Sequence, residues 1–183
     1  MHPRHLPLIF ATAALLASCD ASAPMDTTDD DAGPRPLVSA YSWTQSAPEN
    51  DPFADMRPEG VVCNEEGLII EPATEGDALE IDTAVCDYVT LEQGALNEAK
   101  AGEELEIHIW HSELDADQPA TGYVGLAIGD EIVWEREVPI PSEAGPIDDT
   151  ITLDQPIAFG EPLRVHVHNH GDNAWTLLRI EIP

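Results

Sequence analysis

Basic residues are scarce in this chain, and their scarcity limits its partners. The 183 residues include 7 Lys and Arg against 36 Asp and Glu, which gives a formal net charge of −29 at pH 7. Such a surface repels phosphate groups, so nucleic acid is excluded as a class of partner. Electrostatic attraction to anionic lipid headgroups is disfavoured for the same reason. Because the acidic residues are dispersed, they indicate a strongly solvated surface rather than a cation-binding tract.

Motifs of the common enzyme classes are also missing. The sequence has no Gly-x-Ser-x-Gly nucleophile elbow, no His-Glu-x-x-His zinc motif and no glycine-rich phosphate loop. Carboxylates are so numerous that no pair stands out as the acid and base of a glycoside hydrolase. We therefore expect a noncatalytic protein without a resident cofactor.

A long apolar run occurs near the N-terminus, where Arg4 precedes a largely apolar stretch at 6–17. This order is typical of a secretion signal, and the run is too short to span a bilayer. Its end, Leu16-Ala17-Ser18-Cys19, resembles the lipobox of bacterial lipoproteins. The resemblance implies cleavage of residues 1–18 and acylation of Cys19, whose lipid would hold the protein on an extracytoplasmic membrane surface of the bacterial cell envelope. It leaves open whether that membrane is the inner or the outer one.

Only three cysteines are present, and Cys19 is assigned to the lipid. Cys63 and Cys86 remain as an even pair in a secreted context, where disulfides form and persist. We expect them to be bonded to each other. A metal-thiolate site is the weaker alternative, because the Cys-x-x-Cys spacing is absent.

The composition divides the rest of the chain into two parts. Residues 19–39 are rich in Asp, Ala, Thr and Pro, which predicts a disordered acidic tether after the lipidated cysteine. Residues 40–183 form the predicted folded domain. No repeat of 20–50 residues is visible, which argues against a propeller or a solenoid.

Within that domain, apolar residues alternate with polar ones in short runs separated by Gly, Pro, Asn and Asp. The runs predict strands at 61–63, 68–71, 78–82, 86–91, 103–111, 122–128, 132–138, 150–153, 162–168 and 175–182. Gly129-Asp130 has the residues of a two-residue hairpin turn, and 93–100 fits one short helix. We predict an all-β fold with two antiparallel sheets packed as a sandwich, in a jelly-roll arrangement.

The last 24 residues, 160–183, contain a strand, an Asn/Gly turn and a final amphipathic strand. They resemble the closing hairpin of galactose-binding-like jelly rolls and carbohydrate-binding modules. The resemblance supports the fold and does not define a ligand.

The histidines beyond Cys19 fall in two short segments, 108–111 and 166–170. Strand alternation predicts that Val165 and Val167 face the core and that Arg164 and the histidines beside them face outward. The same rule places His108 and Trp110 outward. On the final strand it places Leu178, Ile180 and Ile182 on one face and Trp175 and Arg179 on the other. If these strands share a sheet, its outer face combines imidazole, indole and guanidinium groups.

Three interpretations of this surface compete. A surface that binds a glycan or a protein partner at the envelope would use Trp110, His108, Arg164, His166, His168, Asn169 and Trp175, through indole stacking and hydrogen bonds. Alternatively, a Zn²⁺ or Cu²⁺ site would use His108, His166, His168 and His170. In the third interpretation these are solvent-facing strand residues and tryptophans whose N–H groups complete turns. Recognition of a glycan or a partner is our leading hypothesis, and the metal site is its alternative.

Overall fold

The structure is a computed structural model that describes residues 33–74 and 76–183. The described residues form strands and short 3-10 turns, with no α-helix among them. The strands are β1 (Arg35–Pro36), β2 (Thr44–Gln45), β3 (Leu68–Ala73), β4 (Gly76–Asp82), β5 (Tyr88–Gly94), β6 (Glu104–His111), β7 (Ala120–Ile128), β8 (Glu131–Ile140), β9 (Gly145–Thr152), β10 (Pro162–His168) and β11 (Ala174–Ile182). The 3-10 turns are η1 (Ala40–Ser42), η2 (Pro48–Asn50), η3 (Ala54–Met56) and η4 (Glu65–Gly67). Over these residues, no helix combines the length and apolar character that a bilayer crossing requires.

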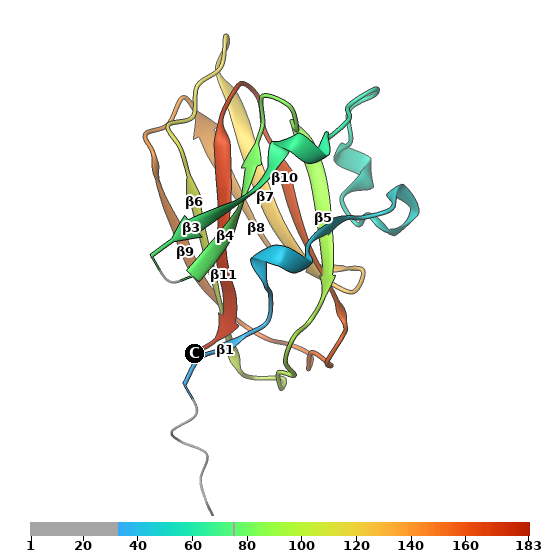
Figure 1. Ribbon diagram of the computed structural model, residues 1–183. Coiled ribbons are helices and arrows are strands. Elements are labelled where there is room, and N and C mark those ends of the chain that lie inside the picture. The colour runs from blue at the N-terminus through green and yellow to red at the C-terminus, as the bar shows by residue number, and fades with distance from the viewer. Residues whose placement is uncertain (1–32, 75) are drawn as a thin grey trace, which may run out of the picture. The chain divides into compact units, whose positions relative to one another are not determined.

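The strands form two antiparallel sheets that face each other (Figure 1). Sheet A has the order β3-β4-β11-β6-β9, with β1 also paired to β11, and sheet B has the order β2-β5-β10-β7-β8. When β1, β2 and β3 are left out, strands β4 to β11 make one sheet of β4-β11-β6-β9 and another of β5-β10-β7-β8. This interleaving is the eight-stranded double Greek key of a jelly roll. The predicted all-β, two-sheet jelly-roll sandwich is therefore confirmed.

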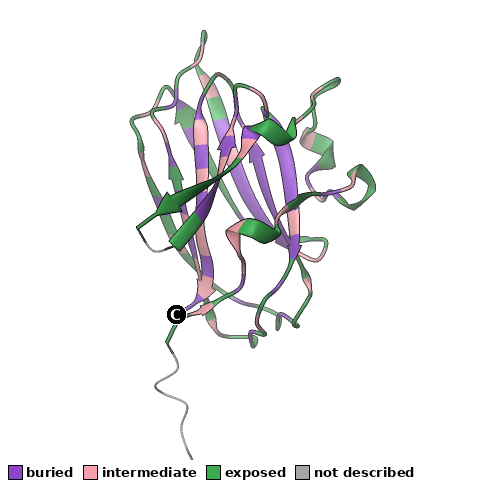
Figure 2. Cartoon of the chain, in the orientation of Figure 1, coloured by how far each residue is buried: buried purple, intermediate pink, exposed green. Residues whose placement is uncertain are grey.

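The hydrophobic core lies between the two sheets. Leu105, Ile107 and Ile109 of β6 alternate with exposed or half-buried residues, and Val165 and Val167 of β10 face them from sheet B. Figure 2 shows buried residues along the strands of both sheets, whereas β3 is largely exposed. The alternation read from the sequence is the alternation that builds this core.

Local predictions agree with the structure where the signal is short-range. Strand β10 has the predicted bounds, 162–168. Gly129 and Asp130 connect β7 to β8, and Gly129 has a φ of 58°, which a glycine adopts without strain. The predicted strand at 61–63 is wrong, because those residues have no regular structure.

The helix predicted at 93–100 is also wrong. Its first two residues belong to β5, and Ala95 and Ala99 are buried by packing into the core. Their N–H groups bond to the carbonyls of Glu161 and Ile157, which are distant in sequence. The apolar residues have a helical spacing, but tertiary hydrogen bonds hold the backbone in an irregular path that bends at Leu96 and Asn97.

Strand β11 does not keep the simple alternation that the sequence suggested. The register against β6 shifts between Leu177 and Arg179, so Leu178 is an extra residue. Such a bulge moves the residues beyond it to the opposite phase of the pleat. Trp175 and Leu177 consequently lie in the core together with Ile180 and Ile182. The predicted outward direction of Trp175 is corrected by this bulge.

The N-terminal boundary of the ordered part also differs from the prediction. Arg35 and Pro36 pair with the end of β11, and Leu37 is fully buried. The end of the predicted 19–39 tether is therefore part of the sandwich. The predicted signal segment 1–18 and Cys19, the predicted lipidation site, lie outside the described residues.

The predicted Cys63–Cys86 disulfide is present, with the two Cα atoms 4.0 Å apart. Cys86 is completely buried two residues before β5, whereas Cys63 lies in the irregular segment before η4. The bond fixes that irregular segment to the core.

Candidate functional site

The outer face of sheet A collects polar side chains in a regular grid. Register places Arg179 of β11 opposite His108 of β6, and His108 opposite Asp148 of β9. The next outward-facing pair along these two strands is Thr176 of β11 and Trp110 of β6. These side chains point away from the core because their neighbours Ile107 and Ile109 point into it.

Two hollows adjoin this grid. One, of about 450 Å³, lies between the segment around η1 and strands β6 and β11. The other, of about 400 Å³, lies between the tip of the β3–β4 hairpin and strands β6, β9 and β11. Four residues line both: Asp77, His108, Leu178 and Arg179. The bulged Leu178 thus reaches the surface at the centre of one continuous groove.

Trp110 is the large aromatic residue of the hollow under the hairpin tip, whereas Tyr41 and Trp43 line the other hollow. The exposed fraction of Trp110 is 42%, and it lines the hollow under the hairpin tip together with Asp148 and Thr176. The hairpin tip is held near the groove because the Tyr41 hydroxyl donates a hydrogen bond to Asp77 Oδ2 at 2.6 Å. An indole surface and hydrogen-bonding groups therefore face the same space.

His108 is held by carboxylates on both sides. Its Nδ1 lies 2.8 Å from Asp148 Oδ1, and its Nε2 lies 3.3 Å from Glu106 Oε2. Partial burial disfavours the charged imidazole, but the hydrogen bonds to Asp148 and Glu106 outweigh that effect and raise the pKa of His108 above its ordinary value.

The second predicted histidine segment is in the other sheet. Arg164, His166 and His168 belong to β10 and face the outer side of sheet B, as the alternation predicted. They would share a face with His108 and Trp110 only if the two strands belonged to one sheet, and β10 and β6 are in different sheets.

Part of the outer face of sheet B, over β5, β10 and β7, is covered by residues 46–57, which we call the strap. Phe53 of the strap stacks on His166 with ring centroids 4.6 Å apart and an interplanar angle of 13°. Gly125 on β7 makes room for this ring, since a Cβ there would lie 2.7 Å from Phe53 Cε1. His166 is completely buried as a result. The alternation in the sequence correctly predicted that the His166 side chain faces outward from the sheet. It did not predict that the strap would bury this side chain.

A hydrogen-bonded chain fixes the strap to the sheet. Thr90 Oγ1 donates to Asp51 Oδ1 at 2.7 Å and therefore accepts from His166 Nδ1 at 2.8 Å. Arg57 forms an ion pair with Asp51 and lies over the Tyr88 ring. Burial lowers the pKa of His166 to about 3, so its ring is neutral in the folded protein.

Three more of the predicted binding residues have structural roles. Arg164 is buried, pairs with Glu92 and donates to the Gly129 carbonyl, which fixes the β7–β8 turn. Asn169 is buried and accepts a hydrogen bond from the Trp175 indole N–H at 3.2 Å. These contacts complete the fold, so the surface role predicted for Arg164, Asn169 and Trp175 is corrected.

The predicted metal ligands do not converge. His108 faces outward from sheet A, whereas His166 faces outward from sheet B, and the core separates them. His168 and His170 remain neighbours, with ring centroids 5.1 Å apart. One site cannot combine them with His108, because packed sheets stand about 10 Å apart with their outer faces on opposite sides.

Sequence reasoning found His108 and Trp110 and missed their partners. Glu106 could have been found, because it has the same strand phase as His108. The contributions of Asp148, Thr176 and Asp77 depend on which strands pair, which one sequence does not contain. Arg179 was placed outward correctly, although its neighbours were not.

No protein-family model matches this chain, and no curated protein matches it significantly. Solved structures with a related backbone include a mannan-recognising carbohydrate-binding module, TmCBM27, with 12% identity and a TM-score of 0.46 over 82% of this chain and 95% of that one. A non-crystalline-cellulose-specific module, CBM28, has 11% identity and a TM-score of 0.45 over 81% and 93%. The apo form of BiXyn10A CBM1 has 15% identity and a TM-score of 0.44 over 78% and 90%. At these identities the likeness concerns the fold alone.

Proposed function

We propose that this protein is a noncatalytic glycan-binding module held at a bacterial cell envelope by an acylated Cys19. The observation that carries glycan binding is the exposed indole of Trp110 in a groove with hydrogen-bonding walls. Sugar rings present C–H groups on their faces and hydroxyl groups at their edges. An aromatic platform beside polar side chains matches both.

The polar groups are placed for the edges of such a ring. Asp148 and Thr176 come from the strands on either side of Trp110, and Arg179 lies beyond them on β11. Carboxylates accept hydrogen bonds from hydroxyl groups, guanidinium groups donate to them, and a threonine hydroxyl does both. The groove therefore offers donors and acceptors around the exposed indole of Trp110.

Charge selects among glycans. Glu106, Asp148, Asp77 and Glu181 add negative charge to the groove region, and the whole chain has a net charge of −29. Glycans with carboxylate or sulfate groups are repelled by this field. A neutral oligosaccharide is the ligand class that the site fits best.

The anchor rests on the sequence Leu16-Ala17-Ser18-Cys19 and the apolar run before it. Lipid on Cys19 would place the acidic tether and then the sandwich outside the cytoplasm. In that compartment the Cys63–Cys86 disulfide is stable. A tethered module of this kind retains a polysaccharide near the membrane without chemical change to it.

A glycan array followed by titration calorimetry tests the binding. We expect neutral oligosaccharides to give signals and acidic ones to give none. Stacking on one face of Trp110 covers roughly 50 Å², worth about 1.3 kcal/mol, and the aromatic geometry adds roughly 0.5–1.5 kcal/mol. Trp110→Ala should thus cost about 2 kcal/mol, or about 30-fold in affinity.

The matched control is Phe159→Ala, which removes an aromatic ring that is 73% exposed and outside both hollows. It should bind as the wild type does. Absence of any array signal, or equal loss from both variants, contradicts glycan binding in the groove. Co-purification of an envelope protein that competes for Trp110 would point to a protein partner instead.

A further inference from the structure

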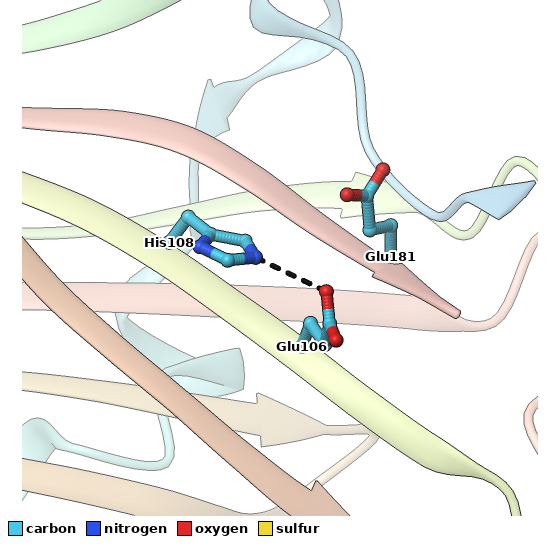
Figure 3. Close-up of side chains that lie close together, drawn as sticks. All are labelled: Glu106, His108 and Glu181. Carbon is cyan, nitrogen blue, oxygen red and sulfur yellow. Dashed lines mark hydrogen bonds and ion pairs between the residues drawn. The ribbon is translucent and has the colours of Figure 1, made fainter. Parts of the chain in front are cut away.

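Three potential ligand groups meet beside the glycan groove. Glu181 of β11 and Glu106 of β6 are directly opposite each other, and His108 is two residues along β6 on the same face. Figure 3 shows the His108 imidazole facing the Glu106 carboxylate, with Glu181 beside them on the neighbouring strand and its carboxylate turned away. One ligand atom from each lies within 4.8 Å of the other two. This spacing allows all three to reach a common ion after small side-chain rotations.

The pairing of two glutamates across neighbouring strands requires a compensating positive charge. Like charges directly opposite each other destabilise a sheet. Arg179 supplies part of the compensation, with its Nε 3.1 Å from Glu181 Oε1, and His108 contacts Glu106. With Asp148 nearby, three carboxylates surround these two groups. A divalent cation would neutralise this local excess of negative charge.

Asp148 prepares the histidine for such an ion. Its carboxylate accepts a hydrogen bond from His108 Nδ1–H at 2.8 Å, which orients the ring so that an ion could bind at Nε2 in place of a proton. That nitrogen faces Glu106. A carboxylate that orients a ligating histidine through its other ring nitrogen is a common arrangement at zinc sites.

We propose that Glu106, His108 and Glu181 bind a divalent transition-metal ion, Zn²⁺, and that Asp148 is a positioning residue for His108. One imidazole and two carboxylates are ligands that zinc accepts. The imidazole favours zinc over calcium and magnesium, which select oxygen ligands alone. His108 and Glu181 line the hollow of about 450 Å³, so water can complete the coordination. This site differs from one built on the histidines of β10.

Titration calorimetry of the untagged full-length chain with ZnCl₂ at neutral pH tests the proposal. We expect wild-type protein to bind one ion and His108→Ala to show no binding at this site. Glu106→Gln and Glu181→Gln keep the side-chain size and remove a charged ligand, so each should weaken the affinity strongly. Asp148→Asn should weaken it about 10–100-fold, as loss of an orienting partner does.

His170→Ala is the control, since it removes an exposed histidine that lies in the loop after β10. Its affinity for Zn²⁺ should equal that of the wild type. Thermal unfolding of each variant without metal identifies any that misfold, and the isosteric glutamine variants keep the test informative. Loss of binding in His170→Ala instead of His108→Ala overturns the proposal, as does tighter binding of Ca²⁺ than of Zn²⁺. No glycan is present in this titration, so its outcome is independent of the proposed glycan binding.

Discussion

Mild acid should destabilise this fold through one buried histidine. Burial lowers the pKa of His166 to about 3, whereas an unfolded histidine has a pKa of about 6.5. The unfolded chain therefore binds a proton at this residue as the pH falls below 6.5, and the folded chain binds it only near pH 3. The stabilisation is complete above pH 6.5 and is lost progressively below it. Linkage gives a loss of about 2 kcal/mol between pH 7 and pH 5.

The titratable groups next to His166 do not reverse the direction of this pH dependence of stability. The Asp51 carboxylate loses stabilisation only on acidification below its ordinary pKa near 3.8, outside the interval from pH 7 to pH 5. His168 has a lowered pKa too and acts in the same direction. A comparison with a variant that keeps these residues therefore isolates His166.

The variant for this comparison is His166→Phe, which keeps an aromatic ring against Phe53 and has no ionisable group. Urea unfolding at pH 7, 6 and 5 gives the free energy of unfolding of both proteins. We expect the difference between wild type and variant to change by about 2 kcal/mol over this range, to the disadvantage of the wild type at pH 5. A difference that is constant with pH would show that His166 is hydrated and that the strap does not exclude water from it.

Three further predictions concern other parts of the chain. Gly125→Ala should lower the free energy of unfolding by about 1–3 kcal/mol, because the new methyl group displaces Phe53; unchanged urea unfolding would contradict the seating of that ring. Replacement of Cys63 and Cys86 by serine should cost about 3 kcal/mol for the loss of a covalently closed loop, measured in the same way, and an unchanged midpoint would argue that the bond does not constrain the chain. Metabolic labelling with a fatty acid should mark the wild type and not Cys19→Ala; an unlabelled wild type in the soluble fraction would refute the anchor.

The strands could be predicted from the sequence because their signal is local. β10 alternates without interruption, and Val165 and Val167 lie in the core as the period of two requires. β11 also carries alternating apolar residues, but one extra residue at Leu178 reverses the phase of half the strand. A bulge of this kind depends on the pairing partner, which the alternation of a single strand does not reveal.

The candidate site was only half predictable for a related reason. His108 and Trp110 share a strand, so their common direction followed from spacing alone. The separation of His166 from them depends on sheet order, and its burial depends on Phe53, a residue 113 positions away in the sequence. Contacts over such separations are set by tertiary packing. The residue types alone therefore do not indicate which residues meet until the order of the strands is known.

Nuclear magnetic resonance of the indole N–H groups tests the central claim most directly. The protein has four tryptophans, of which Trp110 lies in the groove and Trp175 is buried against Asn169. Titration with a neutral oligosaccharide that binds should shift the Trp110 indole signal in proportion to saturation and leave the Trp175 signal in place. Saturable binding that leaves the Trp110 signal unmoved would contradict recognition of glycans by the outer face of sheet A.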